Sequence, residues 1–285
     1  MAISGKDSLI KHLKTFVYNP LIIKNNINCH IYKTFEKCLN LCFNEKGALY
    51  DCILEIESVL DYLHEELNTG HWSKVPIEHR HNFTTASFVK TILLLTSEEF
   101  SSELLRRCLK AVDMGLLLGA PLEENPELLT ECAKYLQTEL NLMEPMSINV
   151  KSIKRRISST EQDFDKLNGN LIEKVYMPSI ETFNKKYFAP QIPVKLKGCM
   201  AHWPASTKWL DLNYLLKVLG NRTVPIEIGS HYTDENWSQK LMTAKDFITK
   251  HYLSDSGDVG YLAQHNLFDQ ITELKEDIRI PEYCS

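Results

Sequence analysis

Two short runs near the end of the chain carry polar residues that a plain apolar core would exclude. In the run 224–229, VPIEIG, alternation puts three aliphatic residues on one face of a strand and Glu227 on the other. In the run 259–265, VGYLAQH, the same rule puts Tyr261 and Gln264 on opposite faces. A carboxylate binds cations and a phenol donates hydrogen bonds to anions, so these strands could line a binding cleft. A solvated sheet face explains the same residues, and the pattern alone favours it.

Two histidine motifs suggest metal binding, but their spacing argues against it. His64 and Glu66 form an H-x-E motif, and His79 and His81 form an H-x-H motif. Residues two apart on a helix point about 200° away from each other, so neither pair can chelate one ion from a regular helix. Exposed histidines on helices or loops are the simpler interpretation.

The cysteines predict buried, reduced thiols of a cytosolic or nuclear protein. They are scattered, mostly on apolar helical faces, and no C-x-x-C pair occurs among them. A disulfide framework or a zinc site therefore fits less well. The positions are Cys29, Cys38, Cys42, Cys52, Cys108, Cys132, Cys199 and Cys284.

Size and composition indicate a globular protein with room for two domains. The chain has 285 residues, of which 44% are hydrophobic and 24% charged. Its net charge of -5 offers no global basic field, so we expect no direct nucleic-acid binding. The N-terminus lacks a long apolar core and no run reaches membrane-spanning length, so we expect no membrane association.

The first half of the chain predicts a helical domain over residues 1–143. Apolar stripes with helical spacing recur, and short connections indicate antiparallel neighbours. The architecture resembles tetratricopeptide-like helical hairpins, although that repeat's fixed period is absent. The clearest stripes contain Cys52, Ile53, Ile56, Leu60 and Leu63, and then Leu105, Cys108, Leu109, Val112 and Leu116.

A polar linker is predicted over residues 144–175, where the periodicity fades. Its basic cluster, 151–156, fits either a nuclear localisation signal or a solvated surface. From residue 176 to 285 predicted helices and strands alternate, which by itself suggests a parallel α/β sheet. The expected helices are 179–188, 209–220 and 243–253, and the expected strands are 191–198, 223–229 and 259–265.

Several long runs resemble one known family. The runs 193–209, 222–239 and 258–271 are similar, in this order, to the opening of a JmjC domain, and 60–72 and 112–120 extend the likeness into the helical half. The resemblance replaces the parallel sheet by an α+β fold, in which the helical domain precedes the leading helices and strands of an incomplete cupin-type double-stranded β-helix. It implies an Fe(II)- and 2-oxoglutarate-dependent hydroxylase or demethylase that acts on arginine or lysine side chains of proteins.

The same resemblance assigns roles to individual residues. It implies that Tyr261 hydrogen-bonds 2-oxoglutarate and that Glu227 faces the substrate side chain, whose guanidinium a carboxylate can hold with two hydrogen bonds. Tyr232, Trp237 and Gln264 match positions near the substrate cleft. Tyr261 and Gln264 can line one cavity only if the strand ends or bulges between them.

The chain departs from the family at the iron site. A JmjC protein holds iron with an H-x-D motif and a distant histidine, and no H-x-D occurs in these 285 residues. We therefore predict a fragment or isoform with no catalytic or metal-binding residue of its own, which binds neither iron nor 2-oxoglutarate stably. The alternative is a non-catalytic module whose helical domain binds a protein partner. A nuclear location, with cytoplasmic presence as well, is expected.

Overall fold

The computed structural model describes most of the chain as two compact units. The described residues are 5–24, 27–44, 49–147, 171–229, 238–254, 259–262 and 264–284. Unit 1 comprises residues 1–146 and 216–272, and unit 2 comprises residues 147–215 and 273–285.

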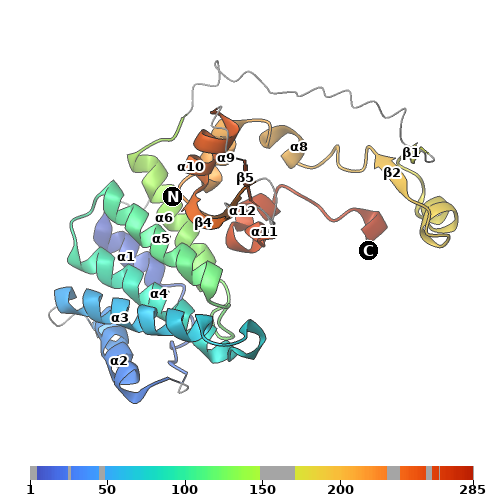
Figure 1. Cartoon of the computed structure of the whole chain (residues 1–285). Helices are drawn as coiled ribbons and strands as arrows, with labels where there is room; N and C mark the ends of the chain where they lie inside the picture. The colour runs from blue at the N-terminus through green and yellow to red at the C-terminus, as the bar shows by residue number, and fades with distance from the viewer. Residues whose placement is uncertain are drawn as a thin grey trace. The chain divides into compact units, whose positions relative to one another are not determined.

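Long helices build the first part of unit 1 (Figure 1). They are α1 (Lys6–Lys14), α2 (Cys29–Asn44), α3 (Leu49–Asn68), α4 (Ile77–Ser97), α5 (Ser102–Leu118) and α6 (Leu128–Met143), with a short 3₁₀ turn at Trp72–Lys74. Helix α4 contacts α3 on one side and α5 on the other. It is buried around most of its circumference, as Phe83, Phe88, Ile92 and Leu95 show, and it therefore forms the centre of the helical core.

The predicted apolar stripes are confirmed as the buried faces of α3 and α5. Cys52, Ile53, Ile56 and Leu63 are buried on α3, and Leu105, Cys108, Leu109 and Val112 are buried on α5. Ser101 precedes α5, and its side chain accepts a hydrogen bond from the backbone N–H of Leu104, which caps the helix. Gly70, two residues beyond the end of α3, has a φ of 80°, a conformation that glycine adopts without strain.

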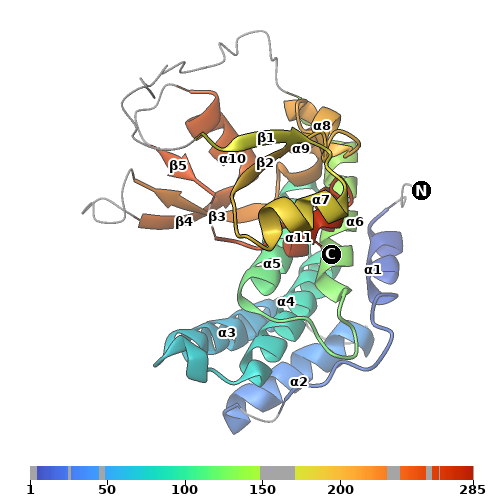
Figure 2. The ribbon, with the colours of Figure 1, turned by 90° about the vertical axis from the view of Figure 1, so that its right-hand side faces the viewer.

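A three-stranded antiparallel sheet forms the second part of unit 1 (Figure 2). Its order is β4 (Ser238–Thr243), β3 (Thr223–Ile228) and β5 (Gly260–Tyr261). The antiparallel pairing agrees with the resemblance and not with the parallel sheet that the alternation alone suggested. Strand β4 was not predicted, because its sequence SQKLMT has no alternating apolar face. Helix α10 (Ala244–Phe247) and a π-helical turn (Ile248–Tyr252) lie between β4 and β5 in the sequence, and α11 (Leu267–Gln270) follows β5.

Unit 2 is smaller and contains a parallel pair of strands. Strand β1 (Glu173–Tyr176) pairs with β2 (Val194–Lys197), and α7 (Ile180–Phe183) with a π-helical turn (Asn184–Phe188) connects them. Helix α8 (Ala205–Lys208) and a 3₁₀ turn (Glu282–Cys284) also belong to this unit. The remaining helices, α9 (Leu212–Leu219) and α12 (Thr272–Lys275), lie where the chain passes from one unit to the other.

The α+β fold is thus confirmed, while the predicted domain boundaries stay a prediction. Helix α6 ends at Met143, but compactness groups the strands β3 to β5 with the helices and not with β1 and β2. Strand β1 begins at Glu173, inside the stretch 144–175 that was expected to be a linker. In the part of the chain that the structure describes, no helix is both long and apolar enough to cross a membrane.

The prediction of buried thiols is confirmed for five cysteines and is wrong for the other three. Five cysteines of unit 1 are buried, whereas Cys29 and Cys284 are exposed and Cys199 is half-buried. The buried five are Cys38, Cys42, Cys52, Cys108 and Cys132.

One buried carboxylate organises unit 2. The side chain of Asp277 is 1% exposed and accepts hydrogen bonds from Lys208 Nζ at 2.7 Å, from Trp209 Nε1 at 3.1 Å and from the Tyr214 hydroxyl. Its backbone carbonyl accepts from the N–H of Ala205 at 3.0 Å. Burial alone would raise the pKa of Asp277, but these donors outweigh burial and hold the pKa below its ordinary value. The segment around Asp277 is therefore tied to α8 and α9 mainly through an ionised carboxylate.

We predict that unit 2 loses this stabilisation in acid. Because the pKa of Asp277 is lower in the folded state, its contribution is present above the unfolded pKa of about 4 and is lost as the pH falls through the folded pKa. The variant Asp277→Asn should be less stable at neutral pH and should depend less on pH below about 5. Fluorescence of Trp209, which contacts Asp277, measured in urea at several pH values would show this. Glu181→Gln, which removes an ion pair with Lys185 that is 77% exposed on both sides, is the control, and parallel pH curves for wild type and Asp277→Asn would contradict the prediction.

Candidate functional site

Glu227 and Tyr261 lie directly opposite each other on neighbouring strands. The register pairs Glu227 of β3 with Tyr261 of β5 on one side and with Gln239 of β4 on the other. Residues that are paired in this way point to the same face of a sheet. The three side chains therefore form one row across the sheet, although two of the strands are separated by about thirty residues of sequence.

The carboxylate in this row is buried and has few partners. Glu227 is only 7% exposed, while Tyr261 is 61% exposed. Among the described residues, the hydrogen bond that Glu227 accepts comes from Gln239 Nε2 over a long 3.4 Å. A buried carboxylate is costly unless donors or a cation satisfy it. Glu227 thus has hydrogen-bonding capacity left for a cationic ligand.

Apolar groups flank the carboxylate on the same face. Pro225 lies two residues before Glu227 on β3 and pairs with Leu241 of β4. Leu241 is 50% exposed. An exposed phenol ring and an exposed leucine beside a carboxylate suit a ligand with an aliphatic stem and a positive end. The stem packs on apolar groups, the ring face attracts the cation, and the carboxylate neutralises it.

The opposite face of β3 explains why Glu227 points to this side. Val224 and Ile226 are both 0% exposed and anchor the strand by their aliphatic side chains. Because side chains alternate along a strand, burial of these two residues leaves Pro225 and Glu227 on the other face. The predicted aliphatic face is confirmed at Val224 and Ile226, whereas Ile228 is half-buried and Glu227 on the other face is buried and not solvated.

A buried polar network holds the beginning of β3 against the helices. Asp113 of α5 is 0% exposed, and its Oδ1 accepts hydrogen bonds from Arg222 Nε at 2.8 Å, Arg222 Nη2 at 2.7 Å and Gln270 Nε2 at 2.8 Å. Its Oδ2 accepts from the backbone N–H of Thr223 at 2.7 Å. Both carboxylate oxygens are therefore satisfied, which a buried charge requires.

Gln270 extends this network to the segment that follows β5. It lies on α11, donates to the carbonyl of Thr223 at 2.8 Å, and its Oε1 lies 2.7 Å from His265 Nε2. Arg222 also donates to the carbonyl of Gln270 at 3.0 Å. The start of β3, α11 and α5 are thus fixed to one another, and these contacts position the strand that carries Glu227.

Sequence reasoning missed these positioning residues, although a signal was present. Asp113 directly follows Val112, within the span of the apolar stripe from Leu105 to Leu116, and Arg222 directly precedes a strand of buried aliphatic residues. Charged residues in such places are almost never fully buried unless they are paired. Nothing in the sequence showed that the two belong to one pair, because 109 positions separate them.

The other predicted site residues have separate outcomes. Strand β5 ends at Tyr261, and Gln264 has a φ of 52° and is exposed. The strand therefore ends between Tyr261 and Gln264, which is the condition under which both could line one cavity. Tyr232 and Trp237 lie outside the described residues, as does the basic cluster 151–156. The roles of Tyr261, Glu227, Tyr232, Trp237 and Gln264 stay predictions.

The described residues around Glu227 do not fit an iron ion. Two histidines and a carboxylate would be needed, yet across the described ranges the group of metal-binding side chains that lie together is elsewhere, at Cys38, Cys52 and Glu55. The H-x-E pair lies on α3 and the H-x-H pair on α4, and both helices are regular there. The exposed hydroxyl of Tyr261 does fit one carboxylate of 2-oxoglutarate as a hydrogen-bond donor.

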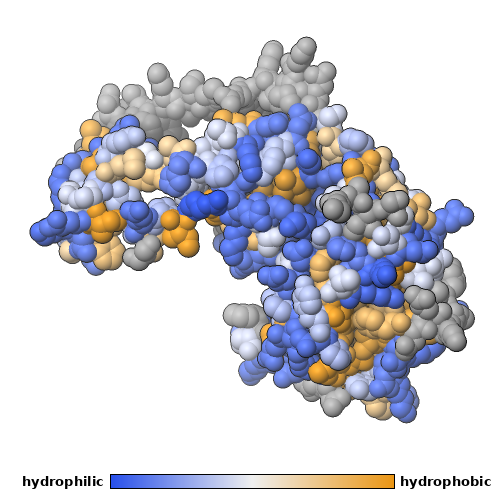
Figure 3. All heavy atoms as spheres, turned by 180° about the vertical axis from the view of Figure 1, so that it is seen from behind, coloured by the Kyte–Doolittle hydropathy of each residue, from blue (hydrophilic) through white to orange (hydrophobic). Residues whose placement is uncertain are grey.

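A separate hollow of about 470 Å³ lies between α3, α4 and α5. Its walls include Phe83, Leu94 and Met114, and the buried hydroxyl of Ser87 has no hydrogen-bond partner among the described residues. Glu57, Asp61, His64, Lys90, Arg107 and Lys110 are its polar residues. Figure 3 shows that apolar side chains remain at the surface of the helical region between polar ones.

Comparison with known proteins identifies the family to which the chain is related. Residues 180–284 match the family model of the cupin-like domain. Over 84% of its length the chain is 36% identical to lysine-specific demethylase 8 of Xenopus tropicalis. It is also 37% identical over 81% of its length to Jumonji C domain-containing protein 5 of Drosophila melanogaster, and 32% identical over 80% to lysine-specific demethylase JMJ30 of Arabidopsis thaliana. The chain is therefore a relative of the JmjC-domain proteins, and the resemblance noted in its sequence is confirmed.

These relatives are longer than the region that matches. The chain spans 63% of the Xenopus protein, 56% of the Drosophila protein and 57% of the Arabidopsis protein. The names of the Xenopus and Arabidopsis relatives describe demethylation of lysine by those proteins, whereas the Drosophila name gives only the Jumonji C domain.

The buried network generates a stability prediction. Arg222→Met leaves the Asp113 carboxylate buried without a cation, so the free energy of unfolding should fall by about 3–5 kcal/mol. Arg222→Lys keeps the charge but not the planar donor group and should cost less. Arg107→Met is the control, because its ion pair with Glu98 is partly exposed and should contribute about 1 kcal/mol or less. Urea unfolding followed by circular dichroism measures all three, and equal losses for Arg222→Met and Arg107→Met would contradict the prediction.

Proposed function

We propose that the face of β3 and β5 that carries Glu227 and Tyr261 binds an arginine or lysine side chain of a protein substrate. In this proposal the side chain is bound as the substrate of the reaction expected for the JmjC family, which is Fe(II)- and 2-oxoglutarate-dependent hydroxylation or demethylation of proteins. Its main support is one observation, the buried Glu227 carboxylate directly opposite the exposed Tyr261. A guanidinium or ammonium group would supply the hydrogen bonds that the long contact with Gln239 does not.

The neighbouring groups favour a long cationic side chain over a free ion. Leu241 offers an apolar surface for the methylene stem, and the Tyr261 ring can lie against the charged end. Arginine is favoured over lysine, because its planar fork can donate to both oxygens of a carboxylate. In the same proposal the Tyr261 hydroxyl donates to 2-oxoglutarate, so that substrate and cosubstrate lie on adjacent strands.

The absence of the family's iron-binding motif limits the activity that we expect of residues 1–285. The H-x-D motif is absent from the printed sequence, so we expect this chain neither to hold iron through the family's triad nor to turn over 2-oxoglutarate. Binding is therefore a better readout than turnover. A nuclear or cytoplasmic location stays part of the proposal.

The binding prediction uses small ligands whose charge can be varied. Arginine amide should bind more tightly than citrulline amide, its neutral isostere, and Glu227→Gln should weaken arginine amide by about 10- to 100-fold, the range expected for one charged hydrogen-bonding partner. Ligand-observed NMR titration measures both affinities. Glu103→Gln, at an exposed position on α5, is the matched control and should leave binding unchanged. Equal binding of arginine and citrulline amides, or no effect of Glu227→Gln, would refute this role.

A second candidate function rests on the hollow between α3, α4 and α5. We propose that it receives an apolar side chain of a protein partner that carries acidic residues beside it. Lys90 pairs with Glu57 at 2.8 Å and Arg107 with Glu98, whereas the described residues give Lys110 no ion pair. Lys110 therefore offers a positive charge to an acidic group of the partner next to an apolar floor, and Asp61, which likewise has no ion pair among the described residues, places a negative charge on the same rim.

Charge reversal at the rim tests this second function. Lys110→Glu should reduce capture of the acidic partner by tagged full-length chain several-fold, because it replaces attraction by repulsion. Lys33→Glu makes the same charge change at an exposed position on α2 outside the hollow and should have no effect. Quantitative mass spectrometry of captured proteins compares the two variants. The proposed binding at the hollow would be refuted if the capture of every protein changed equally in Lys110→Glu and in Lys33→Glu.

A further inference from the structure

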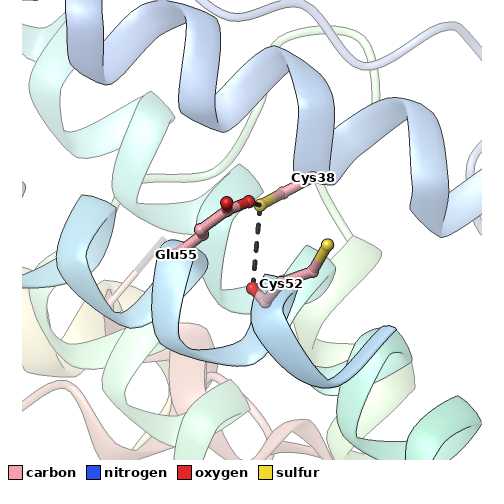
Figure 4. Close-up of side chains that lie close together, drawn as sticks. All are labelled: Cys38, Cys52 and Glu55. Carbon is pink, nitrogen blue, oxygen red and sulfur yellow. Dashed lines mark hydrogen bonds between the residues drawn. The ribbon is translucent and has the colours of Figure 1, made fainter. Parts of the chain in front are cut away.

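Two buried thiols and a carboxylate meet between α2 and α3, far in sequence from Glu227. Cys38 comes from α2, and Cys52 and Glu55 come from α3 (Figure 4). The sulfur atoms and a Glu55 carboxylate oxygen all lie within 4.8 Å of one another. Cys52 and Glu55 are three residues apart and therefore share one helical face. No part of the JmjC comparison involves these residues as a site.

We propose that Cys38, Cys52 and Glu55 form a binding site for a thiophilic divalent cation of the zinc type. Two sulfur ligands with one carboxylate oxygen are a donor set that zinc accepts, and a water molecule can complete a tetrahedron. Ligand atoms around tetrahedral zinc are roughly 3.4–3.8 Å apart, given metal–ligand bonds of about 2.0–2.3 Å. Small side-chain rotations would therefore bring these three atoms into position.

Glu55 is already oriented for this role by a neighbour. Its Oε1 accepts a hydrogen bond from Lys37 Nζ at 2.7 Å, while its Oε2 lies 3.9 Å from Cys38 Sγ. One carboxylate oxygen thus faces the surface lysine and the other faces the thiol. Outer partners of this kind fix the direction of a metal ligand.

The charge of the metal-bound state is balanced. Two thiolates, one carboxylate and the Lys37 ammonium carry a net charge of about −2, which one divalent ion neutralises. Without a cation, burial raises the pKa of Cys38 to about 12 and also raises the pKa of Cys52, so both thiols are protonated. Metal binding must then release two protons, one from each S–H, as two sulfur–metal bonds form.

The other buried cysteines provide a contrast. Burial raises the pKa of Cys42 and of Cys108 to about 12 each, but across the described ranges neither belongs to a group of metal-binding side chains. Cys42 lies on the same helix as Cys38, four residues further on. It is therefore a matched control that differs in its neighbours and not in its burial.

Cobalt(II) titration of full-length chain, reduced with a non-chelating phosphine and stripped of metal, tests the proposal. One equivalent of cobalt should give a thiolate-to-cobalt absorption band that zinc abolishes. Cys42→Ser should keep the band, while Cys38→Ser and Cys52→Ser should lose it. Glu55→Gln, a conservative change at a half-buried position, should weaken cobalt binding at least tenfold. This variant tests the site even if a cysteine variant fails to fold.

The pH dependence separates this site from weak surface binding. Because two protons leave, the apparent affinity should fall about 100-fold for each pH unit below neutrality. Zinc should also raise the melting temperature of wild type and of Cys42→Ser but not of Cys52→Ser. The proposal is overturned if no thiolate band forms, if Cys42→Ser and Cys38→Ser lose it equally, or if the affinity does not depend on pH.

Discussion

The ion pair between Asp113 and Arg222 is the contact on which the arrangement of unit 1 depends. Both groups are almost completely buried, so each is tolerable only in the presence of the other. The pair joins α5 to the residue that directly precedes β3, Asp113 also accepts from the backbone N–H of Thr223, and Gln270 joins this network to the segment after β5. The helices and the sheet therefore form one compact unit. A chain cut at residue 143 would leave the Asp113 carboxylate buried without its guanidinium.

This constraint gives the helical region a role in the proposed substrate site. Arg222 and Thr223 are fixed by α5, and Glu227 follows on the same strand with Val224 and Ile226 packed beneath it. The direction of the Glu227 carboxylate is thus set by helix packing as well as by the sheet. In the JmjC relatives the likeness also extends over both regions, which agrees with a helical part that supports the cupin-like part.

Two carboxylates of unit 1 show how neighbours decide the chemistry of one functional group. Glu227 lies among a phenol, an amide and a leucine, which suit an organic cation. Glu55 lies beside two thiols and a lysine, which suit a metal ion whose charge the lysine helps to balance. The difference comes from the softness of the adjacent sulfur ligands and from the space available, not from the carboxylate itself.

The sequence by itself determined the helical stripes, the strand that carries Glu227 and the family resemblance, because these depend on local periodicity and on contiguous runs of residues. It also showed that Tyr261 and Gln264 need a strand end between them. Only the tertiary structure decided that Tyr261 pairs with Glu227, that Asp113 binds Arg222, and that Cys38 approaches Cys52 and Glu55. Strand β4 was also missed, because its polar sequence has no alternating face. Such contacts arise from packing between distant segments, and no local pattern in the chain specifies which buried polar residue will meet which.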